Sequence, residues 1–110
     1  MLVGMMQLFI DHKAALLQAL AAGGEGYGLE LIDRVKQQTN GAITLLQGRV
    51  YPALRELEQE GFVKSYESDP LPERGGRPRR YYKLTAEGRR AATAQRNAAS
   101  SLFQLGWEGR

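Results

Sequence analysis

The sequence contains no cysteine and a single histidine, His12. The absence of cysteine excludes disulfides and thiolate chemistry, and one histidine alone leaves too few soft ligands for a transition-metal site. No apolar run approaches the roughly 18 residues that span a bilayer. Residues 1–10 are apolar, but they lack the basic region and the cleavage site of a signal peptide. We therefore expect a cytoplasmic protein with no metal, no other cofactor and no membrane partner.

Catalytic motifs are missing as well. The chain has no Gly-x-Ser-x-Gly turn, no Walker sequence and no dinucleotide fingerprint. The Gly-rich segment at residues 75–80 lacks the Lys-Ser/Thr pair and the following helix of a phosphate-binding NTPase loop. Glu56, Glu58 and Glu60 are close in sequence, but on a helix they point in different directions and form a solvated flank. The sequence predicts that the protein is not an enzyme.

The length of 110 residues is that of one domain. Its hydrophobic fraction of 43% and its charged fraction of 25% are ordinary for a globular protein. A domain of this size buries less than about 70% of its unfolded surface, so its core is small. Oligomerisation would add burial, and we expect a homodimer.

The secondary structure is predicted from three signals. Apolar residues recur at helical spacing, apolar and polar residues alternate on both sides of a loop, and Thr85 is a candidate helix cap. The expected elements are helices over 11–22, 28–38, 47–60 and 86–105, strands over 62–68 and 80–85, a minor strand over 43–45, and a loop over 69–79. This order predicts a mainly α protein with a small β-hairpin. We expect a winged helix-turn-helix DNA-binding domain in residues 1–85. In the same compact unit, residues 86–110 form a C-terminal helix for dimerisation.

Positive charge is concentrated in the expected hairpin. The segment Glu73–Lys83 has five cationic residues and one glutamate, a net charge of +4, whereas the whole chain has +3. Its cationic residues are Arg74, Arg77, Arg79, Arg80 and Lys83. Such a segment can neutralise DNA phosphates or enter the minor groove, and Gly75 and Gly76 would let the backbone approach closely. The alternative is a solvated basic loop.

The polar side of the expected helix over 47–60 carries residues suited to reading DNA. They are Gln47, Gly48, Arg49, Tyr51 and Arg55. Arginine pairs with guanine edges or phosphates, and glutamine pairs with adenine. Arg55 could instead form an ion pair with Glu56 or Glu58. The Tyr51 hydroxyl can donate to a phosphate, as can Tyr27 at the start of the preceding helix, although plain packing explains both tyrosines equally well.

Several motifs together resemble the PadR family of transcriptional regulators in its short form. They are Tyr27–Glu30, Gly48–Leu54, Leu57-Glu58, Glu60–Val63, the basic hairpin, and Arg80–Gly88. The resemblance covers about residues 16–90. The chain departs from the family pattern at Arg49-Val50, where members have Ser or Thr and an aliphatic residue. It also has Leu46-Gln47 in place of a Ser-Pro helix start, and we expect its last helix to break at Gly106.

The resemblance implies a sequence-specific DNA-binding regulator, associated with the nucleoid, that represses transcription as a homodimer on an inverted-repeat operator. The last helix would supply the dimer contacts through Ala91, Ala98, Leu102, Phe103 and Leu105. Some family members bind aromatic effectors, so Trp107 is a candidate to stack on such a ligand. The alternative is a winged-helix protein-interaction adaptor without specific DNA binding, which the strongly basic hairpin disfavours.

Overall fold

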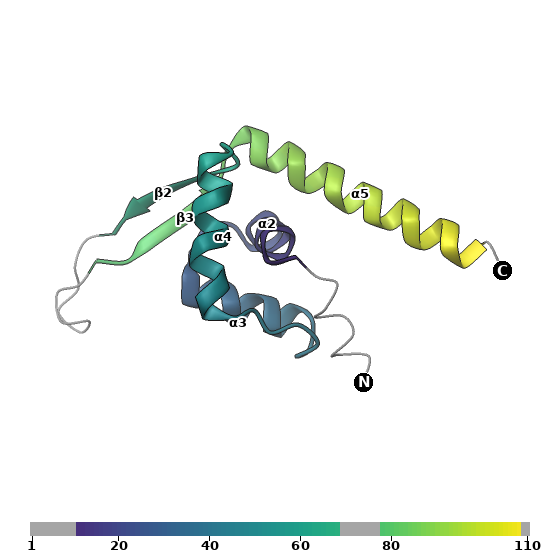
Figure 1. Ribbon diagram of the computed structural model, residues 1–110, viewed down its shortest axis with the longest axis horizontal. Helices are drawn as coiled ribbons and strands as arrows, with labels where there is room; N and C mark the ends of the chain where they lie inside the picture. Colours follow the sequence, from purple (N-terminus) through teal and green to yellow (C-terminus); the bar gives the residue numbers. More distant parts are fainter. Residues whose placement is uncertain (1–10, 69–77, 109–110) are drawn as a thin grey trace.

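The computed structural model of the protein describes residues 11–68 and 78–108, the last six of these by their backbone alone (Figure 1). The described elements are α2 (His12–Gly23), β1 (Gly26–Tyr27), α3 (Gly28–Gln38), α4 (Gln47–Gln59), β2 (Val63–Glu67), β3 (Arg80–Leu84) and α5 (Ala86–Glu108). Most of these residues are helical, and β2 and β3 form a hairpin. The predicted mainly α fold with a small β-hairpin is confirmed.

The hairpin belongs to a three-stranded antiparallel sheet with the order β1-β3-β2. Val63 pairs with Leu84 at one end of the hairpin, and Glu67 pairs with Arg80 at the other. The third strand is Gly26–Tyr27, which pairs with β3. The predicted strand over 43–45 is therefore wrong. Its apolar residues are buried in the core without joining the sheet, because β1 and β2 already pair with both edges of β3.

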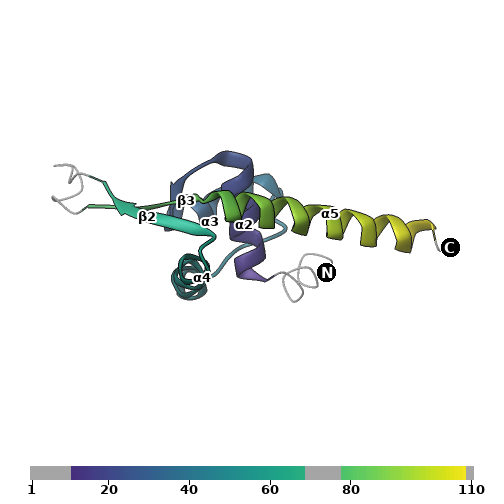
Figure 2. The same ribbon diagram turned by 90° about the horizontal axis from the view of Figure 1, so that it is seen from above.

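The core lies between α2, α3 and α4, and the sheet closes one side of it (Figures 1 and 2). Leucines make up most of the side chains that are fully excluded from solvent, among them Leu16, Leu31, Leu54 and Leu57. The side of α4 predicted to face inward does so. Each buried leucine stabilises the fold by about 1.5–3 kcal/mol relative to an exposed one. Burial of these apolar side chains therefore determines which side of α4 faces solvent.

Arg34 closes the turn between α2 and β1. Its guanidinium donates to the carbonyl oxygens of Ala19 (3.0 Å), Gly24 (2.7 Å) and Glu25 (3.2 Å). These acceptors include carbonyls at the end of α2, where a cation is favourable. A Cβ on Gly23 would lie 2.8 Å from the guanidinium, so glycine makes room for this side chain.

A tight joint connects the hairpin to α5. The Thr85 hydroxyl donates to the Gly61 carbonyl at 2.6 Å and accepts from the Gly88 amide at 3.0 Å, so the predicted helix cap is confirmed. The Thr85 amide donates to the Phe62 carbonyl at 3.0 Å. A Cβ on Gly88 would lie 1.9 Å from that same carbonyl oxygen. The threonine and the glycine of the Leu-Thr-x-x-Gly sequence are therefore both required by this joint.

Helix α5 crosses α2 and then extends away from the three-helix core (Figures 1 and 2). Gln18 on α2 holds the crossing, since its amide donates to the Ala92 carbonyl and to the Gln95 side chain, both at 2.8 Å. The helix continues through Gly106 to Glu108, so the predicted break at Gly106 is wrong. One glycine costs a helix only about 1 kcal/mol, which the neighbouring helix-forming residues offset.

Candidate nucleic-acid interface

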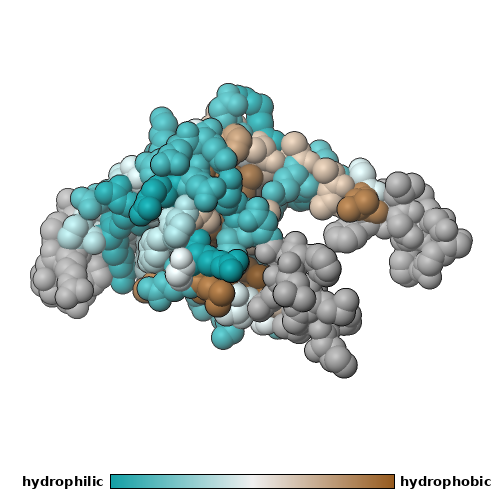
Figure 3. All heavy atoms as spheres, in the orientation of Figure 1, coloured by the Kyte–Doolittle hydropathy of each residue, from teal (hydrophilic) through white to brown (hydrophobic). Residues whose placement is uncertain are grey.

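The outer side of α4 exposes all the residues predicted there. Gln47, Gly48, Arg49, Tyr51 and Arg55 are exposed, whereas Val50, Leu54 and Leu57 are buried on the opposite side. Figure 3 shows hydrophilic residues over α4 and the hairpin. No side-chain hydrogen bond caps α4 at Leu46. The first turn of α4 therefore presents backbone N–H groups and a cationic side chain, which suits an anionic partner.

Tyr51 joins α4 to the first turn of α3. A Cβ on Gly28 would lie 2.6 Å from both the ring and the hydroxyl oxygen of Tyr51, so the tyrosine lies directly across this glycine. The side chain nevertheless remains 39% exposed. Tyr51 therefore packs against α3 while part of its side chain faces solvent.

Arg55 is not held by the carboxylates that the sequence offered as partners. Glu56 lies 3.5 Å from Lys13 of α2, and Glu58 accepts from the Ser65 hydroxyl at 2.7 Å. Within the described residues, no ion pair involves Arg55. The same holds for Arg49 on the preceding turn. Both guanidinium groups are therefore available to an external anion.

The loop end of the hairpin carries two arginines in different settings. The Arg79 guanidinium carbon lies 4.2 Å from the centroid of the Tyr27 ring, a cation–π contact. Arg80 donates to the Ser65 hydroxyl at 2.9 Å and lies 3.5 Å from Glu67. Both members of that ion pair are about half exposed, so solvent screens it strongly. A phosphate can compete with such a partner.

These elements enclose a surface cleft of about 520 Å³. It is lined by Tyr27, Gly28, Leu29, Tyr51, Pro78, Arg79 and Arg80. The start of α3, the exposed side of α4 and the loop end of the hairpin thus meet at one place. The Tyr27 amide donates to the Glu30 carboxylate at 3.4 Å, so one carboxylate already lies beside this helix end. The two arginines provide the opposing positive charge.

A model of the Transcriptional regulator PadR-like family matches residues 16–94.

The chain belongs to this family.

PadR-like proteins are transcription regulators and not enzymes. No curated protein matches the sequence.

Solved structures share the fold at low sequence identity. A transcriptional regulator from Clostridium thermocellum has a TM-score of 0.74 at 21% identity, with 88% of each chain covered. A PadR family regulator from Clostridium difficile R20291 has a TM-score of 0.69 at 24% identity, covering 86% of this chain and 94% of the other. Bacillus subtilis PadR, solved in complex with operator DNA, has a TM-score of 0.63 at 23% identity, covering 74% and 44%.

Lys83 is separated from Arg80 in this PadR-like chain. Side chains alternate along β3, so Arg80 and Tyr82 share one face of the sheet, and Tyr81 and Lys83 share the other. Lys83 pairs in register with Lys64, nearer to α5. Arg79 and Arg80 meet at the cleft, whereas Lys83 is not among the residues that line it. The remaining predicted hairpin residues, Arg74, Gly75, Gly76 and Arg77, lie outside the described residues.

The predicted dimer contacts differ in their surroundings. Ala91 is partly buried against the core of its own chain, while Ala98 is exposed and Leu102 is 66% exposed. The side chains of Phe103 and Leu105 lie outside the described part of α5. So does that of Trp107, whose role in binding an effector stays a prediction that quenching of its fluorescence by aromatic compounds would test.

Sequence analysis missed two residues beside the interface. Leu29 lines the cleft and is 53% exposed, which its apolar character did not suggest. The Nε2 of His12 accepts from the Leu46 amide at 3.1 Å, directly before α4. Partial burial, helped by Arg49, lowers the pKa of His12 below its usual value, while Asp11 opposes this. Neither contact has a local sequence signal, because each joins distant segments.

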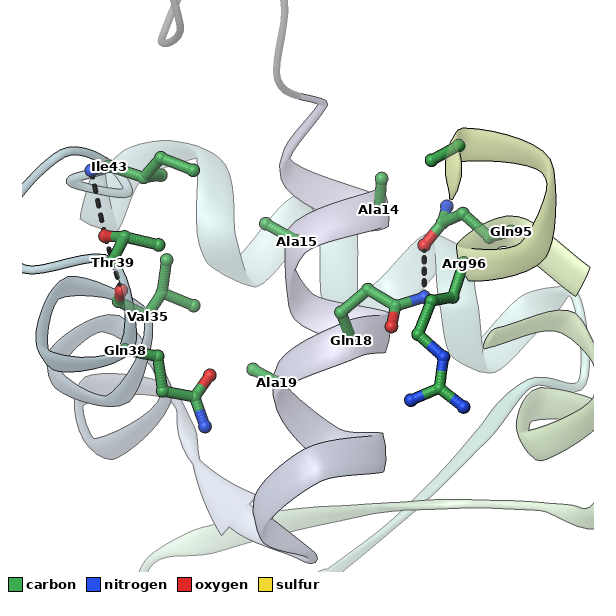
Figure 4. A pocket seen from close by; sticks show the side chains of 11 residues that line it. Ala14, Ala15, Gln18, Ala19, Val35, Gln38, Thr39, Ile43, Gln95 and Arg96 are labelled. Carbon is green, nitrogen blue, oxygen red and sulfur yellow. Dashed lines mark hydrogen bonds between the residues drawn. The ribbon is translucent and has the colours of Figure 1, made fainter. Parts of the chain in front are cut away.

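A second cleft of about 340 Å³ lies between α2, α3 and α5 (Figure 4). Small and apolar side chains such as Ala15, Ala19, Val35 and Ile43 line it, and the Gln18–Gln95 hydrogen bond crosses one side.

No described helix is both long and apolar enough to cross a membrane. The described residues also contain no cluster of three or more side chains suited to a metal ion.

Proposed function

We propose that this PadR-like regulator binds duplex DNA with α4 in the major groove and the hairpin against the adjacent backbone. The observation that carries the proposal is the cleft where the exposed side of α4, the start of α3, and Arg79 and Arg80 converge. Guanidinium groups at the start of a helix suit base edges, and those at the loop end of a hairpin suit phosphates. The PadR of Bacillus subtilis, which shares the fold, was solved with operator DNA, and this supports the proposal.

Each residue has a distinct role in this proposal. Gln47, Arg49 and Arg55 would face bases or nearby phosphates. Tyr27, Tyr51, Arg79 and Arg80 would hold one phosphate segment at the cleft, with Gly48 allowing close approach to α4. Arg74, Gly75, Gly76, Arg77 and Lys83 would add contacts from the hairpin. Arg49 stands where the family has a small hydroxyl residue, so it would alter sequence preference.

We further propose that the protein acts as a homodimeric repressor in the cytoplasm, bound to an inverted-repeat operator. A twofold dimer presents two copies of α4 to one face of the duplex, which requires half-sites about 34–36 Å apart. The part of α5 beyond α2 exposes Ala98 and Leu102, which supports contact with a second copy through residues 86–110. Ala91 would contribute least, because it already packs within its own chain.

Fluorescence anisotropy with selected operator and scrambled duplexes tests the DNA-binding proposal. We expect Arg49→Ala to change the preference between duplexes, with each lost base contact costing about 1–3 kcal/mol. Arg80→Ala should instead weaken binding to all duplexes and lower the salt-dependence slope by about 0.9. Lys36→Ala, on the exposed last turn of α3, is the matched control. If the parent protein binds no duplex at low salt, the proposal is wrong and an adaptor role takes its place.

A further inference from the structure

Three tyrosines form a continuous stack on one face of the sheet. The Tyr66 and Tyr81 rings are nearly parallel, with centroids 5.6 Å apart, and Tyr81 meets Tyr27 edge-on at 5.5 Å. Tyr81 is the register partner of Tyr66 on β2 and of Tyr27 on β1. The tyrosine stack (Tyr27, Tyr66 and Tyr81) therefore joins all three strands, and it ends beneath the guanidinium of Arg79.

The far end of the stack is fixed by Glu25. The Tyr66 hydroxyl donates to the Glu25 carboxylate at 2.5 Å, and this bond raises the pKa of Tyr66. Glu25 precedes β1 and its carbonyl accepts from Arg34, so the turn that carries it is itself held. Neither Glu25 nor Tyr66 lines the cleft at the start of α3. The Tyr66 ring is linked to the cleft through the rings of Tyr81 and Tyr27.

The near end of the stack fixes the side chain of Arg79. The Arg79 amide donates to the Ser68 hydroxyl at 3.1 Å, and its carbonyl accepts from the Ser68 amide at 2.7 Å. Its main chain is therefore held where the described part of the hairpin ends. An arginine side chain has several rotatable bonds and loses their freedom when it binds a phosphate. The Tyr27 ring restricts that freedom before binding, so less entropy is lost on contact.

We propose that Glu25, Tyr66 and Tyr81 are positioning residues that hold Arg79 in the cleft in its phosphate-binding orientation. The inference rests on the proposed DNA-binding function. Under this proposal, Glu25, Tyr66 and Tyr81 affect DNA affinity although none of them lines the cleft. Their contribution passes through Arg79, so it should disappear when Arg79 is removed.

A double-mutant cycle tests this dependence. We expect Tyr66→Leu to weaken binding to duplex DNA by roughly three- to tenfold and to lower the salt slope toward that of Arg79→Ala, a change of about 0.9. In an Arg79→Ala background, the same Tyr66→Leu change should have no further effect. Tyr66→Phe keeps the ring but loses the bond to Glu25, so it should recover only part of the affinity lost in Tyr66→Leu. Lys64→Leu, exposed on the same face of β2, is the matched control.

Thermal unfolding of each variant shows whether a loss of DNA binding comes from a loss of folded protein. Tyr66 is 40% exposed, so we expect the Tyr66→Leu variant to remain folded. Equal losses from Tyr66→Leu with and without Arg79 would overturn the inference. Binding by Arg79→Ala that equals the parent's would also overturn it, while leaving the proposed function intact. A parent protein that binds no duplex would remove both.

Discussion

Two glycines near the start of a helix have opposite surroundings. Gly48 is the second residue of α4, and apart from its chain neighbours and the backbone of its own helix no atom lies within 4 Å of the position that a Cβ would occupy. Gly88 is the third residue of α5, and a Cβ there would lie 1.9 Å from a backbone oxygen. Substituting alanine at each position therefore distinguishes a glycine that leaves room for a partner from a glycine that leaves room for the protein's own backbone.

We expect Gly88→Ala to lower the free energy of unfolding by at least about 2 kcal/mol, because the Phe62 carbonyl must move. Gly48→Ala should keep or raise that free energy by about 0.5–1 kcal/mol, since alanine favours the helix. If DNA approaches α4 closely, Gly48→Ala should also weaken its binding about tenfold, or about 1.4 kcal/mol. Urea unfolding and fluorescence anisotropy measure the two effects. Equal stabilities of the two variants would contradict the geometry at Gly88.

At the scale of elements, His12 connects α2 to the start of α4. The Leu46 amide donates to His12 Nε2, which requires that nitrogen to be unprotonated. Arg49, Asp11, Lys13 and Glu56 line the adjoining cleft, and burial with Arg49 lowers the pKa of His12 in the folded state. The unfolded chain therefore binds a proton at higher pH than the folded chain does.

The resulting stability is fully present above the unfolded pKa of about 6.5 and is lost as the pH falls from there toward the lower folded value. We expect the free energy of unfolding to decline between pH 7.5 and 5.5 more steeply for the parent than for His12→Gln, which does not titrate. Urea unfolding at several pH values measures this difference. Parallel pH profiles of the two proteins would rule out the contribution of His12.

Local patterns were sufficient to predict most elements. The apolar side of α4, the cap at Thr85 and the alternation along β3 depend on neighbouring residues, and all three agree with the structure. Strand β1 was missed because two residues carry no periodicity and pair only through the fold. The contacts of Arg34 carry no local signal either, since its acceptors lie 9–15 residues away.

The candidate site was predictable as a set of residues but not as an arrangement. Tyr27, Tyr51, Arg79 and Arg80 were all expected, and they line one cleft. The contact of Arg79 with the Tyr27 ring joins residues far apart in sequence, so no spacing indicates it. The separation of Lys83 from Arg80, in contrast, already follows from strand alternation.

At the scale of the whole molecule, the exposed part of α5 is the surface that would gain most from packing against a second copy of the chain. The helix has 23 residues and spans about 35 Å at 1.5 Å per residue, more than its contact with α2 covers. An isolated helical segment of this kind is marginal in water without packing. Ala98 and Leu102 are one turn apart, so they lie on the same side of α5.

We expect Leu102→Glu to weaken self-association at least tenfold, or about 1.4 kcal/mol, because it buries a charge in the proposed interface. Affinity for an inverted repeat should fall toward that for a single half-site. Sedimentation equilibrium gives the first quantity and anisotropy the second. Asn97→Glu, on a different side of α5, serves as the control and should leave both unchanged. A parent protein that sediments as a monomer at all concentrations would exclude the dimer.

The joint at Thr85 has a consequence for the choice of operator. Only this residue separates β3 from α5, and its bonds to Gly61 and Gly88 leave little freedom there. If two copies associate through α5, the direction in which each hairpin leaves the dimer is set at this threonine. The number of base pairs between half-sites would then depend on the rigid connection at Thr85, which does not itself contact the DNA.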